Sequence, residues 1–271
     1  RVIASALEIT RLTSRYLIVR GLLGPARDLV RQIITNCGLF GFHEDDREIL
    51  ALRHEQGRIA LEGGDHSAAE AELRRVIAAR RISLGENHAD TLASRHKLAK
   101  AILEQGRWAE AEPLLRSIVL AENDVRGHEH RDTIVVRHSL ARALLALGRA
   151  PEAESMVREI LDVCRRLWSP ANPETLFAQV TLARSLLEQG KADDAGFEIR
   201  DALSNAAQPP DTPAVMQLRH TFINVLMMQG RVPEAEAELA KLLADRCRVL
   251  GATHPETERA RNLLAHVRKA L

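Results

Sequence analysis

Six glycines recur along the chain at nearly constant intervals, and the residues around each glycine recur with them. An alanine follows each glycine by five residues, and an apolar residue precedes it by three. Self-similarity at such a period is typical of a solenoid, in which each repeat buries its apolar face only by stacking on its neighbours. The glycines, separated by 43, 42, 42, 42 and 40 residues, are Gly21, Gly64, Gly106, Gly148, Gly190 and Gly230.

Each repeat has the pattern of two helices. Apolar residues at helical spacing end at the glycine, which tolerates the left-handed conformation of a helix cap. A second helix is predicted to start within a few residues, with acidic residues at its positive end. We predict helix pairs beginning near residues 6, 49, 91, 133, 175 and 215. The fifth pair ends in the Pro-rich stretch "NAAQPPDTPA", which predicts a shortened second helix.

A last amphipathic helix is predicted from Thr257 to Leu271, where it would close the stack. Its apolar side carries Leu263, Leu264 and Val267, which we expect to face inward. Its basic side is expected to face solvent and carries Arg259, Arg261 and Lys269. A terminal helix with a polar outer face is what a soluble repeat array needs.

The composition agrees with closely packed helices and excludes several classes of protein. Hydrophobic residues make up 45% of the 271 residues, but aromatic residues only 3%. The 38 basic and 37 acidic residues leave a net charge of +1, so no overall field draws the chain to nucleic acid or membrane. No apolar run approaches the roughly 18 residues of a membrane span. The three scattered cysteines predict reduced thiols and a cytoplasmic location.

Two junctions between helix pairs carry a more specific motif. They read "LGENHADT" from Leu84 to Thr91 and "LGATHPET" from Leu250 to Thr257, with weaker variants ending at Thr133 and Thr175. A Leu-Ala pair also recurs eight and seven residues before the glycines, at Leu98-Ala99, Leu140-Ala141 and Leu182-Ala183. Together with the glycine and alanine pattern, these motifs resemble the tetratricopeptide repeat (TPR) in its longer, kinesin-light-chain type. The resemblance implies an all-α, right-handed α-solenoid (TPR superhelix) of six helix pairs plus a C-terminal capping helix. It predicts one array over 1–271, with repeats at about 6–48, 49–90, 91–132, 133–174, 175–214 and 215–256 and a cap at 257–271.

The resemblance also implies a ligand groove lined by the first helix of each pair. Ten residues before the glycines stand mostly histidines, and six residues before them stand mostly bases. Positions one helical turn apart face the same side. The candidate groove residues are His54, Arg58, His96, Lys100, His138, Arg142, Arg184, His220 and Asn224.

The charges beside these bases suggest where an acidic ligand would bind. A glutamate follows three of them by four residues and would offset their charge: Glu62, Glu104 and Glu188. No acid stands at that position after Arg15 or Arg142. The sequence therefore favours the middle of the array, around His96, Lys100, His138 and Arg142. Histidines with pKa values near 6.5 would make binding sensitive to pH.

A purely structural interpretation of the same residues stays open. The arginine before each histidine could lay its aliphatic stem over a neighbouring helix. The histidines could be hydrogen-bonded by adjacent repeats, and repeat duplication also copies residues that have no task. Equivalent histidines lie on helices about 8–10 Å apart, whereas zinc ligands lie within about 2.1 Å of one ion. We therefore predict no metal site, no cofactor and no enzyme.

The leading functional prediction is a protein-interaction scaffold that binds a peptide or partner protein with acidic character in the groove. Glutamines such as Gln105, Gln189 and Gln229 would fit such a peptide. The alternative is the sensor arm of a larger bacterial STAND-type signalling ATPase or transcriptional regulator, whose nucleotide-binding part would lie outside these residues. Nucleic-acid binding is disfavoured because few aromatic side chains are present to stack on bases. The oligomeric state stays open, because exposed repeat ends can stack.

Overall fold

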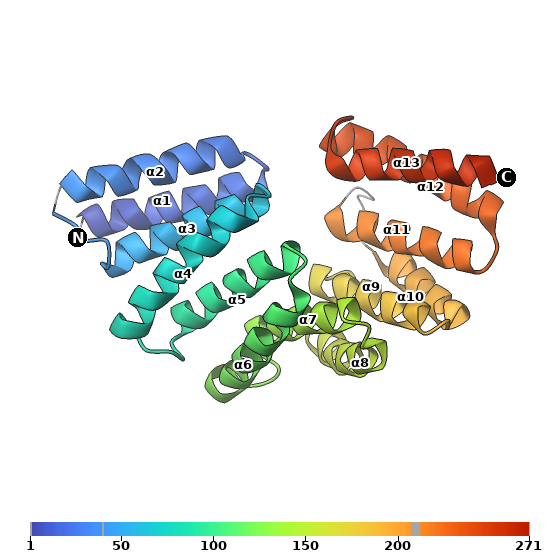
Figure 1. Cartoon of the computed structure of the whole chain (residues 1–271), viewed down its shortest axis with the longest axis horizontal. Coiled ribbons are helices and arrows are strands. Elements are labelled where there is room, and N and C mark those ends of the chain that lie inside the picture. The colour runs from blue at the N-terminus through green and yellow to red at the C-terminus, as the bar shows by residue number, and fades with distance from the viewer. Residues whose placement is uncertain (1, 40, 207–211, 271) are drawn as a thin grey trace. The chain divides into compact units, whose positions relative to one another are not determined.

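The computed structural model describes residues 2–39, 41–206 and 212–270, and these form thirteen α-helices with no strand among them (Figure 1). The chain divides into two compact units, residues 1–139 and 140–271, with the boundary inside α7. The helices are α1 (Val2–Val19), α2 (Leu23–Leu39), α3 (Arg47–Glu62), α4 (His66–Ser83), α5 (Ala89–Glu104), α6 (Trp108–Arg126), α7 (Arg131–Ala146), α8 (Ala150–Leu167), α9 (Pro173–Glu188), α10 (Ala192–Asn205), α11 (Pro213–Met228), α12 (Val232–Leu250) and α13 (Pro255–Ala270).

Within each unit, consecutive helices pack as stacked pairs. We call the odd-numbered helices α1 to α11 the A helices and the even-numbered helices the B helices. In the first unit α1 packs on α3 and α3 on α5, while α2 and α4 each contact the A helices on both sides. In the second unit α9 packs on α11, with α10 against both, and α13 packs on α12. The predicted all-α helix-pair fold is confirmed.

Each A helix ends in the same hydrogen-bonded turn, which explains the glycine period. At Gly106 the backbone φ is +75°, a left-handed value that favours glycine. Its N–H donates to the carbonyl of Leu103 at 2.9 Å, and the Arg107 N–H donates to that of Ile102 at 3.2 Å. The same pair of bonds recurs at Gly21, Gly64, Gly148, Gly190 and Gly230.

The junction motif begins the next A helix. The Nδ1 atom of His88 accepts the N–H of Asp90 at 3.1 Å, and the Thr91 hydroxyl donates to the carbonyl of Gly85 at 2.9 Å. His130 caps α7 in the same way through Asp132. The junction histidines are therefore capping residues. Because the cap precedes the first apolar position, the A helices after α1 start two residues before the predicted points.

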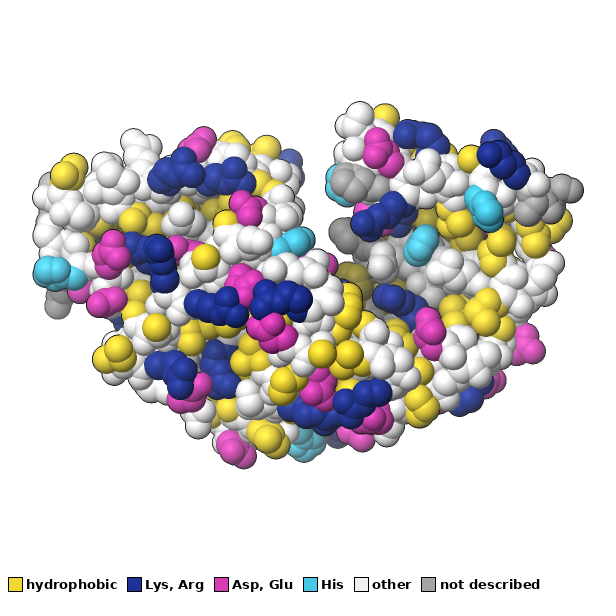
Figure 2. All heavy atoms as spheres, in the orientation of Figure 1, with side chains coloured by type: hydrophobic (Ala, Val, Ile, Leu, Met, Phe, Trp, Pro, Cys, Tyr) yellow, Lys and Arg dark blue, Asp and Glu magenta, His cyan; other side chains and the backbone are white. Residues whose placement is uncertain are grey.

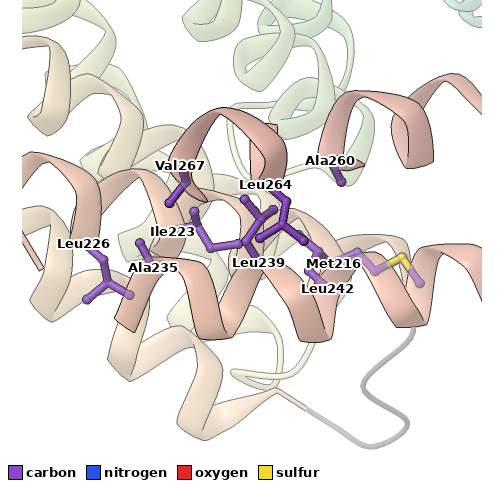
Figure 3. Close-up of a cluster of buried hydrophobic side chains, with 9 residues drawn as sticks. All are labelled: Met216, Ile223, Leu226, Ala235, Leu239, Leu242, Ala260, Leu264 and Val267. Carbon is purple, nitrogen blue, oxygen red and sulfur yellow. The ribbon is translucent and has the colours of Figure 1, made fainter. Parts of the chain in front are cut away.

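The core follows the repeat pattern. The alanines five residues after the cap glycines (Ala26, Ala69, Ala111, Ala153, Ala195 and Ala235) are all fully buried. In the last repeat Leu239 of α12 lies among residues from α11 and α13, including Ile223 and Leu264 (Figure 3). These small alanines let the A and B helices approach closely.

The C-terminal helix is amphipathic, as predicted from the sequence. It runs over Pro255–Ala270 and buries Leu264 and Val267, while Arg259, Arg261 and Lys269 are exposed. Leu271, which we predicted as the last residue of this helix, lies outside the described residues. The confirmed sidedness gives this end of the chain a polar surface.

Two further predictions concern the extent of the array. α10 has 14 residues and the other B helices 17 to 19, which confirms the shortened fifth pair. The prolines at 209 and 210 that suggested it lie outside the described residues. The assignment of one array over 1–271 stays a prediction. No helix in the described ranges has the length and apolar content needed to cross a membrane.

Candidate ligand-binding surface

Each unit has a pocket on its A helices. The first pocket, of about 360 Å³, lies among α1, α3, α4 and α5, and its lining includes Arg11, Arg15 and His54. The second pocket, of about 370 Å³, lies between α9 and α11. Its lining is Arg184, Leu187, Glu188, Asn224 and Met228. The lining of the first pocket includes Arg11, Arg15 and His54, and that of the second includes Arg184 and Asn224, all of which stand ten or six residues before a cap glycine.

The bases at the first pocket are engaged by carboxylates. Glu55 is fully buried, and its Oε1 and Oε2 atoms accept hydrogen bonds of 2.7 Å from Arg15 and Arg58 respectively. Arg15, for which we predicted no acidic partner, therefore has one, and Arg58 pairs with Glu55 where we predicted Glu62. Glu62 instead accepts from Lys100 of the next repeat at 3.3 Å. The first prediction failed because the partner of Arg15 comes from the next repeat, and the second because Arg58 pairs three residues back along α3 instead of four residues forward.

The second pocket differs because two of its polar side chains have no hydrogen-bond or ion-pair partner among the residues that the structure describes. In the ranges that the structure describes, no carboxylate lies within 4.0 Å of the Arg184 guanidinium, and the amide of Asn224 makes no hydrogen bond. Glu188, the predicted partner of Arg184, acts on it only at longer range. Partial burial, and next the charge of Arg142, lower the pKa of Arg184, while Glu188 opposes this. Arg184 and Asn224 both stand six residues before a cap glycine.

The histidines of the ladder link neighbouring A helices. His54 Nδ1 lies 3.1 Å from Ser94 Oγ, and His96 Nε2 lies 2.9 Å from Ser139 Oγ. Burial lowers the pKa of His54 well below its usual value and lowers that of His96 to about 3. Burial also lowers the pKa of His220. Our prediction that these three histidines titrate near pH 6.5 is therefore wrong, because burial, complete for His54 and partial for His96 and His220, disfavours the charged imidazolium.

The neutral state of His96 predicts a loss of stability in acid. Its pKa is about 3 in the folded chain and about 6.5 when unfolded, so between these values the unfolded state binds the extra proton. The contribution of neutral His96 to the free energy of unfolding is complete above about pH 6.5 and falls as the pH decreases toward 3. When the pH falls from about 7 to 4.5, we expect the free energy of unfolding of His96→Gln to decrease by about 1–2 kcal/mol less than that of wild type. Urea unfolding at the two pH values measures both decreases. The same substitution at exposed His128 is the control; an equal pH dependence in both variants would contradict the assignment.

The arginines that precede the histidines tie each A helix to its own B helix. Arg53 reaches Glu72 at 3.1 Å, and Arg219 reaches Asp245 at 2.6 Å. Arg95 donates to the hydroxyl of Ser117 at 2.8 Å. These contacts, like those of His54 and His96, support the structural interpretation of the Arg-His ladder.

The remaining predicted groove residues, His138 and Arg142, both have interaction partners. His138 also influences His96 electrostatically. Arg142 belongs to the second unit, whereas His96, Lys100 and His138 belong to the first. The central cluster of these four residues stays a prediction.

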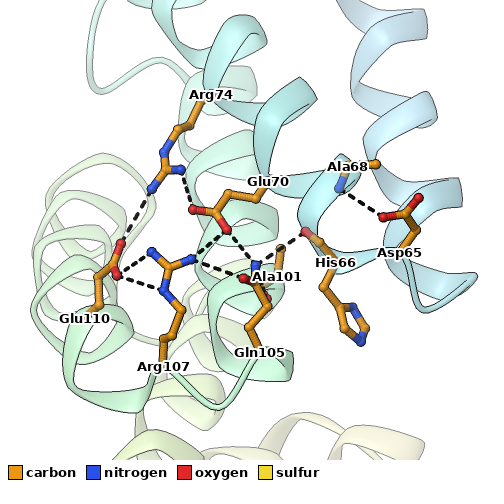
Figure 4. A network of polar contacts seen from close by, with 9 residues as sticks. All are labelled: Asp65, His66, Ala68, Glu70, Arg74, Ala101, Gln105, Arg107 and Glu110. Carbon is orange, nitrogen blue, oxygen red and sulfur yellow. Dashed lines mark hydrogen bonds and ion pairs between the residues drawn. The ribbon is translucent and has the colours of Figure 1, made fainter.

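The glutamines that we predicted to meet a peptide are engaged instead between repeats. Gln105 Nε2 donates to Glu70 Oε2 at 2.6 Å, and Arg107 donates to the same oxygen at 2.7 Å (Figure 4). Gln189 and Lys191 approach Glu154 in the same way, at 2.8 and 3.1 Å. Burial alone would raise the pKa of Glu154, but these hydrogen bonds and one from Arg158 lower it to about 2. A similar bond joins Gln229 to Asp193 at 2.9 Å.

Sequence reasoning missed two buried charged residues that line the first pocket. Glu55 is the only acid nine residues before a cap glycine, a signal that could have identified it. Arg80 is buried and donates to the Asp90 carbonyl and the Ser94 hydroxyl, both at 2.7 Å. Arg246 stands at the same distance after the cap glycine of the last repeat, is also buried and donates to the Glu256 carbonyl at 3.0 Å, and this recurrence could have identified both arginines. No group of His, Cys, Asp or Glu among the described residues is arranged to hold a metal ion.

Comparison with known structures finds the same fold in several repeat proteins. A Podosopora anserina protein with nearly identical TPR-like repeats, described as a kinesin light chain, is 24% identical (TM-score 0.63, 77% of this chain and 99% of that one). BtubC (BKLC) from P. vanneervenii is 15% identical, with a TM-score of 0.61 over 93% of this chain and 92% of that one. NprR in complex with its cognate peptide NprX is 12% identical, with a TM-score of 0.72 over 97% of this chain and 71% of that one. At these identities the likeness concerns the fold alone.

Family models give the more direct assignment. Residues 48–119, 96–166 and 132–206 match one model described as tetratricopeptide repeat, and residues 224–256 match a second with the same description. The sequence comparison with curated proteins gives no match. The two models together cover well over half of the sequence. The chain therefore belongs to the tetratricopeptide repeat family.

Proposed function

We propose that the chain is a non-catalytic interaction module that binds a peptide segment of a partner protein on its A helices. The observation that carries this proposal is the second pocket, where Arg184 and Asn224 make no hydrogen bond or ion pair to the rest of the described chain. A binding surface needs polar groups that the fold has left unused. NprR, a protein of similar fold, was solved with a bound peptide, which supports the choice of ligand.

The chemistry of the pocket indicates the kind of peptide. The amide of Asn224 can both donate and accept, which matches the N–H and C=O groups of an extended backbone. The guanidinium of Arg184 can bind a carboxylate through two parallel hydrogen bonds. Leu187 and Met228 supply apolar walls. The ligand that fits is an extended peptide with an Asp or Glu beside an apolar side chain.

We expect Arg184→Glu to weaken peptide binding at least about tenfold, which corresponds to about 1.4 kcal/mol. The reversed charge would repel the acidic residue of the ligand. The measurement begins with selection of binders to the wild-type chain from a displayed library of random peptides. The affinity of each selected peptide for wild type and variant is then compared by calorimetry.

Lys241→Glu provides the matched control. It also replaces a positive by a negative charge, but on the exposed surface of α12, away from the A helices. Its affinities should equal those of wild type. Failure to select any peptide, or equal affinities of wild type and Arg184→Glu, would contradict the proposal. Selected peptides without an acidic residue would contradict the assigned role of Arg184.

The second function predicted from the sequence is the sensor arm of a larger STAND-type signalling ATPase or regulator. It requires a nucleotide-binding segment beside this array. A coding region that places a phosphate-binding loop directly before Arg1 would favour the sensor arm over a free-standing module. The peptide-binding test applies to both, because a sensor arm also needs a ligand on its A helices.

A further inference from the structure

Two repeats bury an arginine at the same position, sixteen residues after the cap glycine. Arg80 of α4 is 5% exposed, and Arg246 of α12 is 2% exposed. Each donates to the backbone carbonyl of the second residue of the following helix, Arg80 to Asp90 at 2.7 Å and Arg246 to Glu256 at 3.0 Å. Because arginine stays charged in proteins, each site holds a positive charge away from water.

The two arginines differ in how their charge is compensated. A carboxylate oxygen of Glu256 lies 3.4 Å from Nη2 of Arg246. The equivalent acid beside Arg80 is Asp90, which is one methylene shorter, and its carboxylate lies 3.8 Å from Arg47 instead. Among the described residues, no carboxylate lies within 4.0 Å of the Arg80 guanidinium, which bonds only to carbonyl and hydroxyl oxygens. Burial lowers the pKa of Arg80, and nearby carboxylates offset this only in part.

Arg80 lines the first pocket, of about 360 Å³, which is in the size range of sites for small organic ligands. The other arginines of the lining already have acidic neighbours, in the pairs Arg11–Glu8, Arg15–Glu55 and Arg47–Asp90. Glu48, the remaining acid of the lining, is exposed to water. Ala51, Leu52 and Ala93 add apolar surface. The buried charge that this pocket leaves without a contacting counter-charge is therefore that of Arg80.

The last repeat shows which anion fits beside such an arginine. There the chain itself supplies a carboxylate, that of Glu256. A phosphate group would bring a charge of about −1.5 to −2 at pH 7. It would face the four acids in the lining of the first pocket. A carboxylate brings a single negative charge, which matches the single uncompensated arginine.

We propose that the first pocket binds a small organic acid, whose carboxylate pairs with Arg80 as the carboxylate of Glu256 pairs with Arg246. A short apolar part of the ligand would contact Ala51 and Leu52. The site shares no residue with the second pocket and does not depend on the peptide proposed there. A free acid and an acidic side chain of a peptide share this chemistry, so the test includes both.

Titration of the 271-residue chain with butyrate, followed by NMR, tests the proposal. The readout is the Nε–H signal of Arg80, assigned by through-bond correlation to its own backbone, which reports on this site alone. We expect a saturable shift with a dissociation constant on the order of 1 mM, as is reasonable for so small a ligand. Sodium chloride at the same ionic strength is the reference. Methyl phosphate should bind at least about tenfold more weakly than butyrate.

Asp90→Glu gives the site a carboxylate of its own, as in the last repeat. We expect it to weaken butyrate binding at least about tenfold, because the new side chain competes for Arg80. Asp132→Glu is the matched control at the same position of the next junction, where the residue equivalent to Arg80 is Glu122. This control and Arg184→Glu should both bind butyrate at the first pocket like wild type, which separates the site from the second pocket.

The outcomes distinguish the site from its occupant. An Arg80 signal that does not shift saturably with butyrate would overturn the proposal. Equal butyrate binding by wild type and Asp90→Glu would overturn it as well, since the carboxylate would then lie away from Arg80. Methyl phosphate that binds as tightly as butyrate would contradict the choice of a carboxylate. A tripeptide amide with a central glutamate that binds more tightly than butyrate would support the site but assign it to a peptide side chain and not to a free acid.

Discussion

Leu239→Ala is expected to lower the free energy of unfolding by about 2–5 kcal/mol. Leu239 is fully buried among side chains of α11, α12 and α13, so truncation removes apolar contacts of three helices at once. A cavity there closes poorly, because Ile223, Leu226 and Val267 are held by their own helices. Urea unfolding followed by circular dichroism measures the change.

The matched control is Leu250→Ala at the exposed C-terminal end of the same helix. It removes the same atoms from a site already in contact with water, so we expect a loss below about 1 kcal/mol. Equal losses in the two variants would show that the cluster in Figure 3 does not stabilise the repeat.

Glu55→Gln is expected to destabilise the first unit by about 2–4 kcal/mol. The carboxylate is fully buried and bound by Arg15 of α1 and Arg58 of α3. Removing one member of a buried ionic group leaves the remaining charges without compensation, which typically costs about 3–5 kcal/mol. Arg15 is partly exposed and can regain water, which reduces the expected value. Thermal and urea unfolding both measure this change.

The same substitution at Glu62 controls for the loss of an acid on α3. Glu62 pairs with Lys100 at a more exposed position, where such pairs are worth about 0–1 kcal/mol. If Glu55→Gln proved as mild as Glu62→Gln, the Arg15–Glu55–Arg58 group would not be the link that holds α1 to α3.

Most of the fold could be predicted from the sequence, because the same residue types recur at the same positions of six repeats. The six cap glycines occupy the turns that require a left-handed residue, and the six alanines after them are all buried. The A helices start slightly earlier than their apolar pattern predicted. The reason lies in residues such as His88, whose capping role depends on backbone geometry and not on hydropathy.

The site was less predictable, because its polar contacts form between repeats. Gln105 is one residue from its cap glycine, yet its partner Glu70 is 35 positions away in sequence. The pKa of His96 depends on how deeply α5 is packed, which the spacing of bases and histidines does not encode. Arg184 and Asn224 were predicted as groove residues, but that they make no hydrogen bond or ion pair to other described residues was visible only in the structure.

The hydrogen-bonded turns at the glycines join each A helix to its own B helix, and links such as Gln189 to Glu154 reach only the adjacent repeat. Inserting one residue inside an A helix would rotate everything after it by about 100° and turn its buried face to water. Inserting or deleting one full period returns every alanine and every link to an equivalent neighbour. The architecture therefore tolerates changes of length by gene duplication of whole repeats, while it resists the loss or gain of single codons.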